Sequence, residues 1–373
     1  MKGKAGRTII VLLLLLAICG VGAAAIFYQK NSLAHVYLKK LSGQPRTEKP
    51  AATNTATATP FKPTKLNRQL KKMHFNGNVA VIKGGRIIYQ RPYGHDPEQT
   101  KKTVTTKYQI GTLQNALTAA AIMHLVQEGK VNLETPVSHY YLLDNADASV
   151  TVGSLLTMTS GLSLTAQPAS ELNADVISWN LANATGSTTG TYDFQSVNYA
   201  LLAGIVAQAS GVSYSQYLQK VLLKPAGTTQ TGFVKDAATQ QKLAPPFKYD
   251  QANAQATAVS QATLFQAMND QLGTDQLYTT ASDLGRVVRY LASNHFLKPK
   301  YRDQGLFAND NAYTGRLTQQ NQQLTGRADF SGYHSALAFD VSGKTGVVLL
   351  SNYQTRGSLP DTAQRLLQQV QAD

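Results

Sequence analysis

The stretch Ile110-Gly111-Thr112-Leu113-Gln114-Asn115, followed by the alanine-rich run 116–121, decides how this chain folds. Apolar side chains recur every four residues from Leu113 to Leu125, which predicts a buried helix from Thr112 to Glu128 that ends at Gly129. Residues three apart share one helix face, so Thr112 and Asn115 point the same way. The stretch therefore presents a hydroxyl and an amide together at the start of a central helix.

Strand patterns stand at both ends of the region around this helix. Residues 79–82 and 86–89 flank a glycine turn and predict a β-hairpin, and residues 335–340 and 347–352 predict a second strand pair. Further helices are expected over 213–221 and from Ser282, which is a suitable N-cap. Strands at both ends with helices between them predict that the terminal strands share one sheet.

Two more stretches carry distinctive sequence patterns. Residues 155–162 read Leu-Leu-Thr-Met-Thr-Ser-Gly-Leu, and residues 277–284 read Leu-Tyr-Thr-Thr-Ala-Ser-Asp-Leu. Together with the opening stretch they resemble the signatures of the serine β-lactamase and penicillin-binding protein superfamily, in the branch of class C β-lactamases and D,D-peptidases. The resemblance covers about residues 70–370. It implies an α/β (α+β) fold, with an antiparallel sheet flanked by helices and a mostly helical subdomain.

The same resemblance shows that the first catalytic motif is degenerate. Active relatives carry Ile-Gly-Ser-x-x-Lys, in which the lysine amine takes the proton of the attacking serine hydroxyl. Here Thr112 stands at the serine and Asn115 at the lysine, and no Ser-x-x-Lys occurs elsewhere in the chain. Met158 likewise replaces the histidine of the second signature. The frame is present, but its acid–base chemistry is missing.

The second motif of active relatives, Tyr-Ser-Asn, aligns with Phe194-Gln195-Ser196 ahead of Tyr199-Ala-Leu-Leu. Phe194 has no titratable group with which to relay a proton. A shift of two residues would bring Asn198 to the asparagine position, but it would put Ser196 at the tyrosine position and break the match at Tyr199.

The third motif, Lys/His-Thr/Ser-Gly, has two candidates. Lys344-Thr345-Gly346 has the right letters but is expected to form the turn between the last two strands. The positional candidate is Leu324-Thr325-Gly326, which keeps Thr-Gly and has lost the cation. The expected ligand pocket therefore comprises Thr112, Asn115, Phe194, Ser196, Leu324, Thr325 and Gly326, with no confident catalytic residue among them.

Charge is concentrated near the N-terminus. Residues 1–72 hold 13 Lys/Arg and one acid, whereas residues 73–373 hold 22 Lys/Arg and 20 acids. A nearly neutral domain argues against nucleic-acid binding. The single cysteine, Cys19, excludes an intrachain disulfide, and no spacing of ligands predicts a metal site or a cofactor. A triad that uses one of the seven histidines stays open, but His124 and His334 are each expected to be structural.

Four regions are expected. Residues 1–7 form a basic cytoplasmic tail, 8–27 an uncharged segment long enough to span a bilayer once, 28–69 a basic Thr/Ala/Pro tether, and 70–373 the folded domain. Two rivals to an uncleaved anchor stay open: a signal peptide cleaved near 23–25, and a lipoprotein lipidated on Cys19. The resemblance places the domain outside a cell membrane, as on a Gram-positive exterior.

The function predicted from the sequence is that of a membrane-anchored, penicillin-binding-protein-like pseudoenzyme. It would bind or scaffold at the cell envelope, with a cell-wall polymer or a peptidoglycan-related compound as ligand. The alternative is an active hydrolase of the same superfamily, a D,D-carboxypeptidase, D-alanyl esterase or β-lactamase, that uses Thr112 or an unrecognised nucleophile. The sequence leaves the oligomeric state open.

Overall fold

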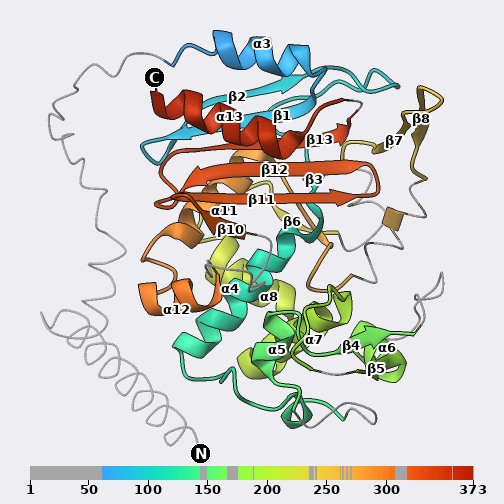
Figure 1. Cartoon of the computed structure of the whole chain (residues 1–373), viewed down its shortest axis with the longest axis vertical. Coiled ribbons are helices and arrows are strands. Elements are labelled where there is room, and N and C mark those ends of the chain that lie inside the picture. Colours follow the sequence, from blue (N-terminus) through green and yellow to red (C-terminus); the bar gives the residue numbers. More distant parts are fainter. Residues whose placement is uncertain are drawn as a thin grey trace, which may run out of the picture. The chain divides into compact units, whose positions relative to one another are not determined.

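A six-stranded antiparallel sheet forms the upper half of the domain in Figure 1, in the order β10-β11-β12-β13-β1-β2. In this computed structural model the first strands of the domain lie beside the last, because β1 pairs with β13 from Gly77 opposite Ser351 to Ile82 opposite Gly346. The prediction that the terminal strands share one sheet is confirmed. The strand bounds are β1 Asn76–Lys83, β2 Arg86–Tyr93, β10 Leu317–Gln320, β11 Gln323–Phe330, β12 Tyr333–Asp340 and β13 Gly346–Tyr353.

The structure describes residues 61–142, 149–165, 175–187, 189–234, 242–260, 271–306, 317–354 and 356–372, with 239, 262, 264, 265 and 268. The tail, the uncharged segment and nearly all of the tether expected before residue 70 therefore lie outside the described residues. Within the described ranges, no helix is both long and apolar enough to cross a membrane.

One face of the sheet is covered by α3 (Thr64–Lys72) and α13 (Leu359–Ala372). Leu66 and Leu70 of α3 and Leu366 and Leu367 of α13 are buried against Val79, Val81 and their neighbours on this face. We call this the outer face. Full burial stabilises the fold by about 1.5–3 kcal/mol for each such aliphatic side chain. The boundary expected at residue 70 falls inside α3, and the compact unit begins at Phe61.

The other face, called the inner face, is covered by α11 (Ala281–Ala292) and by the helical part of the domain. At its centre lies α4 (Gln114–Gln127), whose residues are buried on nearly every side, as expected of an alanine-rich central helix. The other helices and helical turns of this part are η1 Gly111–Leu113, η2 Val137–His139, α5 Val152–Leu156, α6 Val176–Asn183, α7 Ser196–Ser210, α8 Tyr214–Leu218, η3 Gln219–Leu223 and α12 Pro299–Gly305.

Three small sheets complete the described part of the fold. The strands β3 (Tyr108–Gln109), β9 (Leu277–Thr279) and β6 (Gly232–Phe233) form one of them and lead directly into η1. The other two are the pairs β4 (Leu162–Leu164) with β5 (Ala184–Gly186), and β7 (Phe247–Asp250) with β8 (Gln255–Ala258).

The fold class predicted from the sequence is confirmed, and one helix cap is corrected. The hairpin at Gly84-Gly85 and the final strand pair occur where their patterns predicted them. α11, however, is capped by Thr280, whose hydroxyl accepts from Asp283 N–H, and not by Ser282. Among the described residues, the buried members of both hydrophobic cores lie between 66 and 370.

Candidate functional site

Thr112 lies in η1, the single 3₁₀ turn that leads from β3 into α4. Gly111 before it has φ +59°, a left-handed conformation that glycine adopts without strain. A Cβ atom at Gly111 would lie 2.8 Å from the Cβ of Ala328 in β11, so the backbone of η1 passes directly over that strand. The glycine before Thr112 is therefore required both by its dihedral angle and by this close approach.

Gln114 fastens the first turn of α4 to the neighbouring small sheet. Its Oε1 accepts from the N–H groups of Gln276 (2.8 Å) and Leu277 (2.7 Å). Its Nε2 donates to the Tyr214 hydroxyl at 3.3 Å. These bonds fix the position of Thr112 through the backbone. Burial raises the pKa of Tyr214 to about 12 against the opposing effect of Thr118 and Gln114, so this tyrosine is a neutral structural group at physiological pH.

The Thr112 hydroxyl is not hydrogen-bonded to a general base among the described residues. Its side chain is partly exposed, and among the described residues it makes no hydrogen bond or ion pair with any side chain. Asn115, one turn further along α4, is fully buried and carries a neutral amide. An amide oxygen is far too weak a base to take a hydroxyl proton at neutral pH.

The start of α7 brings the second group of predicted residues into place. Ser196 is the first residue of that helix, and Phe194 packs, half-buried, against the larger core. Asn198 in the first turn is buried, where its Oδ1 accepts from Ser160 Oγ at 2.6 Å and its Nδ2 donates to Gln195 O at 3.1 Å. Both ends of this amide are used inside the fold, which disfavours the shifted alignment.

The strand β11 carries the positional candidate for the third motif. Its buried residues Leu324, Gly326 and Ala328 alternate with more exposed ones, and Leu324 lies in the larger core. The β11 side chains nearest to Gly111 are those of Ala328 and Phe330, not that of Leu324. The letters Thr-Gly that suggested the third motif stand at 325–326, earlier on the strand than Ala328.

No cation of β11 points toward η1. Arg327 neighbours Ala328 in the strand, so the two side chains lie on opposite faces of the sheet. Arg327 pairs with Ala336, which belongs to the outer core. The other candidate, Lys344-Thr345-Gly346, forms the turn between β12 and β13 as predicted, where the Asp340 carboxylate accepts from the N–H groups of Lys344 and Thr345.

Comparison with known proteins identifies the family of this chain. The Beta-lactamase family model matches residues 68–371. The chain belongs to the Beta-lactamase family. The chain is 24% identical to PbpX of Bacillus subtilis over 308 residues, which covers 82% of this chain and 77% of that protein.

Two solved structures extend the comparison to the fold. The structure of FmtA from Staphylococcus aureus is similar with a TM-score of 0.71 and 18% identity, covering 90% of this chain and 95% of FmtA. A class C beta-lactamase gives a TM-score of 0.62 and 21% identity, with 83% and 94% of the two chains covered. At these identities the similarity establishes the fold of this family member alone.

His124 and His334, the two domain histidines weighed for a different catalytic group, both have other partners. His124 of α4 shares a hydrogen bond of 2.8 Å with the Tyr217 hydroxyl and stacks on Phe296, and burial lowers its pKa against the opposing charge of Glu128. His334 Nδ1 lies 2.5 Å from Asp329 Oδ1. Among the described residues, no three potential metal ligands cluster.

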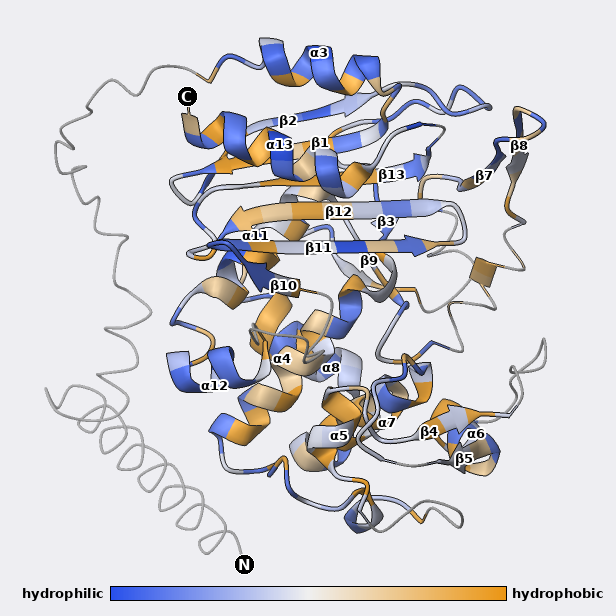
Figure 2. Cartoon of the chain, viewed as in Figure 1, coloured by the Kyte–Doolittle hydropathy of each residue, from blue (hydrophilic) through white to orange (hydrophobic). Residues whose placement is uncertain are grey.

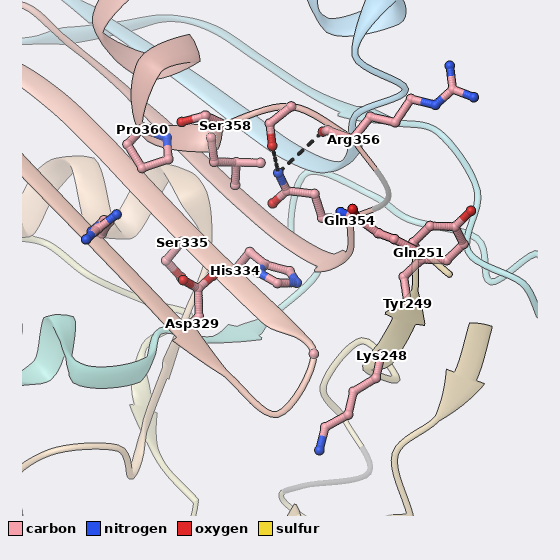
Figure 3. A pocket seen from close by; sticks show the side chains of 14 residues that line it. Lys248, Tyr249, Gln251, Asp329, His334, Ser335, Gln354, Arg356, Ser358 and Pro360 are labelled. Atoms are coloured by element: carbon pink, nitrogen blue, oxygen red, sulfur yellow. Dashed lines mark hydrogen bonds and ion pairs between the residues drawn. The ribbon is translucent and has the colours of Figure 1, made fainter. Parts of the chain in front are cut away.

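Figure 3 shows the surroundings of His334, a hollow of about 560 Å³ on the outer face of the sheet. Asp329 lies beside His334, while the side chains of Arg356 and Lys248 extend away from them. Because Ala328 points to the inner face, its neighbour Asp329 points away from η1, so this His–Asp pair is on the wrong side of the sheet to serve Thr112.

Sequence reasoning missed Gln114, Ala328 and Phe330 as neighbours of the site. Gln114 is adjacent to a predicted residue, but nothing in its sequence context predicts that its amide holds Gln276 and Leu277. Ala328 and Phe330 follow from the pairing of β11 with β12, in which Phe330 stands opposite Tyr333 across a two-residue turn. The glycine at position 332 indicates this register, because its φ of +90° is typical of the turn between two paired strands.

Proposed function

We propose that this chain is a non-catalytic member of the Beta-lactamase family that binds a peptidoglycan-related compound of the cell envelope on the surface around Thr112. The observation that carries the proposal is the Thr112 hydroxyl, which makes no hydrogen bond to a base among the described residues. Removal of a positioned general base alone slows such reactions by a factor on the order of 10²–10⁴.

Two further replacements support the absence of catalysis. Phe194 occupies the position of the proton-relaying tyrosine, and its ring has no exchangeable proton. The inner face of β11 offers Gly326 and Ala328 where a cation would hold the carboxylate of a substrate. Nucleophile, base, relay and cation are thus replaced together.

Retention of the supporting framework favours a binding role. The hydrogen bonds of Gln114 and the left-handed Gly111 still hold Thr112 at the end of the turn between β3 and α4. We place the domain outside the membrane, anchored through residues 8–27.

Calorimetric titration of the full chain with a muropeptide ending in D-alanyl-D-alanine tests this function. We expect saturable binding without release of D-alanine. Thr112→Arg, which fills the site with a long cationic side chain, should abolish binding, and the matched variant Thr318→Arg on the exposed side of β10 should leave it unchanged. Release of D-alanine that is lost in Thr112→Ala would instead establish the hydrolase alternative, and absence of binding would refute the proposal.

A further inference from the structure

The net positive charge of the folded domain comes from its first elements. Residues 61–95 contain eight Lys/Arg and no acid, whereas residues 96–373 contain 19 Lys/Arg and 20 acids. The first stretch forms α3, β1 and β2, which lie together at one end of the described domain in Figure 1. A single-sign patch of this kind attracts a partner of the opposite sign.

The helix α3 presents most of these charges outward. Lys65, Arg68, Lys71 and Lys72 are exposed, while Leu66 and Leu70 face the sheet and are buried. None of these four cations makes an ion pair with any side chain of the described residues. Figure 2 shows α3 as a mainly hydrophilic helix that covers the sheet with its narrow apolar side. The charges are therefore available to a partner.

A hollow of about 550 Å³ lies between α3 and β2 inside this patch. Four of its lining residues carry basic side chains: Lys71 and His74 at the end of α3, Arg91 of β2, and His95 just after it. No acid lines it. Arg91 lies 5.9 Å from the ring centre of Tyr93, which supports the guanidinium from one side. Arginine and lysine converging without an acid form the usual protein receptor for a phosphate group.

We propose that the α3–β2 face binds the phosphate headgroups of an anionic lipid bilayer. The charges extend along a helix about 13 Å long and onto the adjoining strand, a wider area than a single phosphate ion would need. The chain that precedes Phe61 continues the same character, with eight Lys/Arg and one acid in residues 1–60. An anionic bilayer is a surface of the required sign and extent, and this choice of partner rests on the anchorage proposed above for residues 8–27.

The contact is electrostatic and superficial. The apolar residues of α3 are occupied in the outer core, so the helix has no apolar face left to insert among acyl chains. Affinity should therefore fall steeply as salt is raised, because exposed charges are screened within a Debye length. This inference is independent of what binds around Thr112.

Vesicle co-sedimentation of residues 61–373, whose cores are complete, tests the proposal. Vesicles of equal parts phosphatidylglycerol and phosphatidylcholine should bind the domain, and phosphatidylcholine alone should not. The triple variant Lys65→Gln, Arg68→Gln, Lys72→Gln should bind on the order of 100-fold more weakly, since each basic residue near the surface contributes about fivefold. The pair Lys71→Gln with Arg91→Gln tests the hollow in the same way.

The matched control removes three exposed lysines elsewhere, Lys220, Lys224 and Lys300, and should leave vesicle binding within the error of the wild type. Equal weakening in this control would show a general charge effect and would overturn the proposal. So would absence of binding to phosphatidylglycerol vesicles. Binding of soluble polyphosphate as tight as that of the vesicles would also overturn it, in favour of a free anionic polymer.

Discussion

Thr112 and Asn115 stand one helical turn apart, and their chemistry decides what the site can do. A hydroxyl becomes a nucleophile only when its proton has somewhere to go, and the neighbouring amide cannot accept it. The replacement of lysine by asparagine also suits the setting, because Asn115 is fully buried and an unpaired ammonium there would be costly. The prediction that this site is inactive rests on residue types read from the sequence, and it stays a prediction.

Restoring the first motif alone should not restore activity. The double variant Thr112→Ser, Asn115→Lys regains nucleophile and base, but Phe194 still cannot relay a proton and the inner face of β11 still lacks a cation. We expect hydrolysis of a chromogenic cephalosporin to stay at the background rate, with circular dichroism used to verify folding. Rapid turnover by a folded double variant would show that the other two motifs have been misread.

Gly111 offers a second residue-scale test with an internal control. Gly111→Ala introduces strain at φ +59° and a Cβ atom 2.8 Å from that of Ala328, whereas Gly129→Ala introduces similar strain at φ +71° with no atom within 4 Å. Strain should cost about 1–2 kcal/mol at either position, and overpacking a further 1–3 kcal/mol at Gly111 alone. Urea unfolding measures both. Equal losses would contradict the close contact between η1 and β11.

At the scale of elements, sequence periodicity predicted long strands and helices but not the shortest strands. The hairpin of β1 and β2 and the turn at Lys344 were predictable because alternation and glycine turns are strong signals. The strands β3 and β6, of two residues each, are too short to carry a pattern. The letters Thr-Gly at 325–326 suggested the third motif in the sequence, whereas the pairing of β11 with β12 could be determined only in the structure.

Buried polar contacts also join elements that the sequence keeps far apart. Asp96, after β2, accepts from Asn352 Nδ2 of β13 at 3.1 Å and from Thr100 N–H, and its Oδ2 lies 3.4 Å from Lys102 Nζ. Burial by itself would raise the pKa of Asp96, but the hydrogen bonds and the lysine charge outweigh it and lower the pKa. Burial lowers the pKa of Lys102 against the attraction of Asp96.

Asp96→Asn should therefore destabilise the domain by about 3–5 kcal/mol, because it leaves Lys102 buried without its counter-charge. The lowered pKa of Asp96 means that its stabilising effect is complete above the ordinary value of 3.8 and is lost as the pH falls through the folded-state pKa. The variant should accordingly show a shallower loss of stability below about pH 4 in urea titrations. Asp303→Asn, in an exposed pair with Arg302, should change stability by less than about 0.5 kcal/mol.

At the scale of the whole molecule, the compact unit begins at Phe61, within the last residues of the expected tether. Residues 51–63 have the composition of a linker. The basic residues of α3 follow this linker directly, and the boundary was therefore expected at residue 70. The apolar pair Leu66 and Leu70, spaced four apart, was the signal that a packed helix had already begun. The basic side chains of this helix are exposed, whereas its two leucines are buried in the outer core.

Removal of residues 1–60 should leave the stability of the domain unchanged. Both cores are formed within residues 66–370, so the shortened chain retains every buried contact described above. Thermal unfolding followed by circular dichroism should give a single transition at the midpoint of the full chain in matched detergent. A midpoint lowered by several degrees would mean that the first sixty residues contribute to the packing of the domain.

We propose that the Thr112 hydroxyl, which makes no hydrogen bond to a described base, is not activated as a nucleophile. Intact-protein mass spectrometry after prolonged exposure to a fluorescent penicillin tests it most directly, with Thr112→Ala as the reference. We predict an unmodified mass for both proteins. A penicilloyl adduct on the wild-type chain that disappears in Thr112→Ala would contradict the claim and show that Thr112 is a working nucleophile.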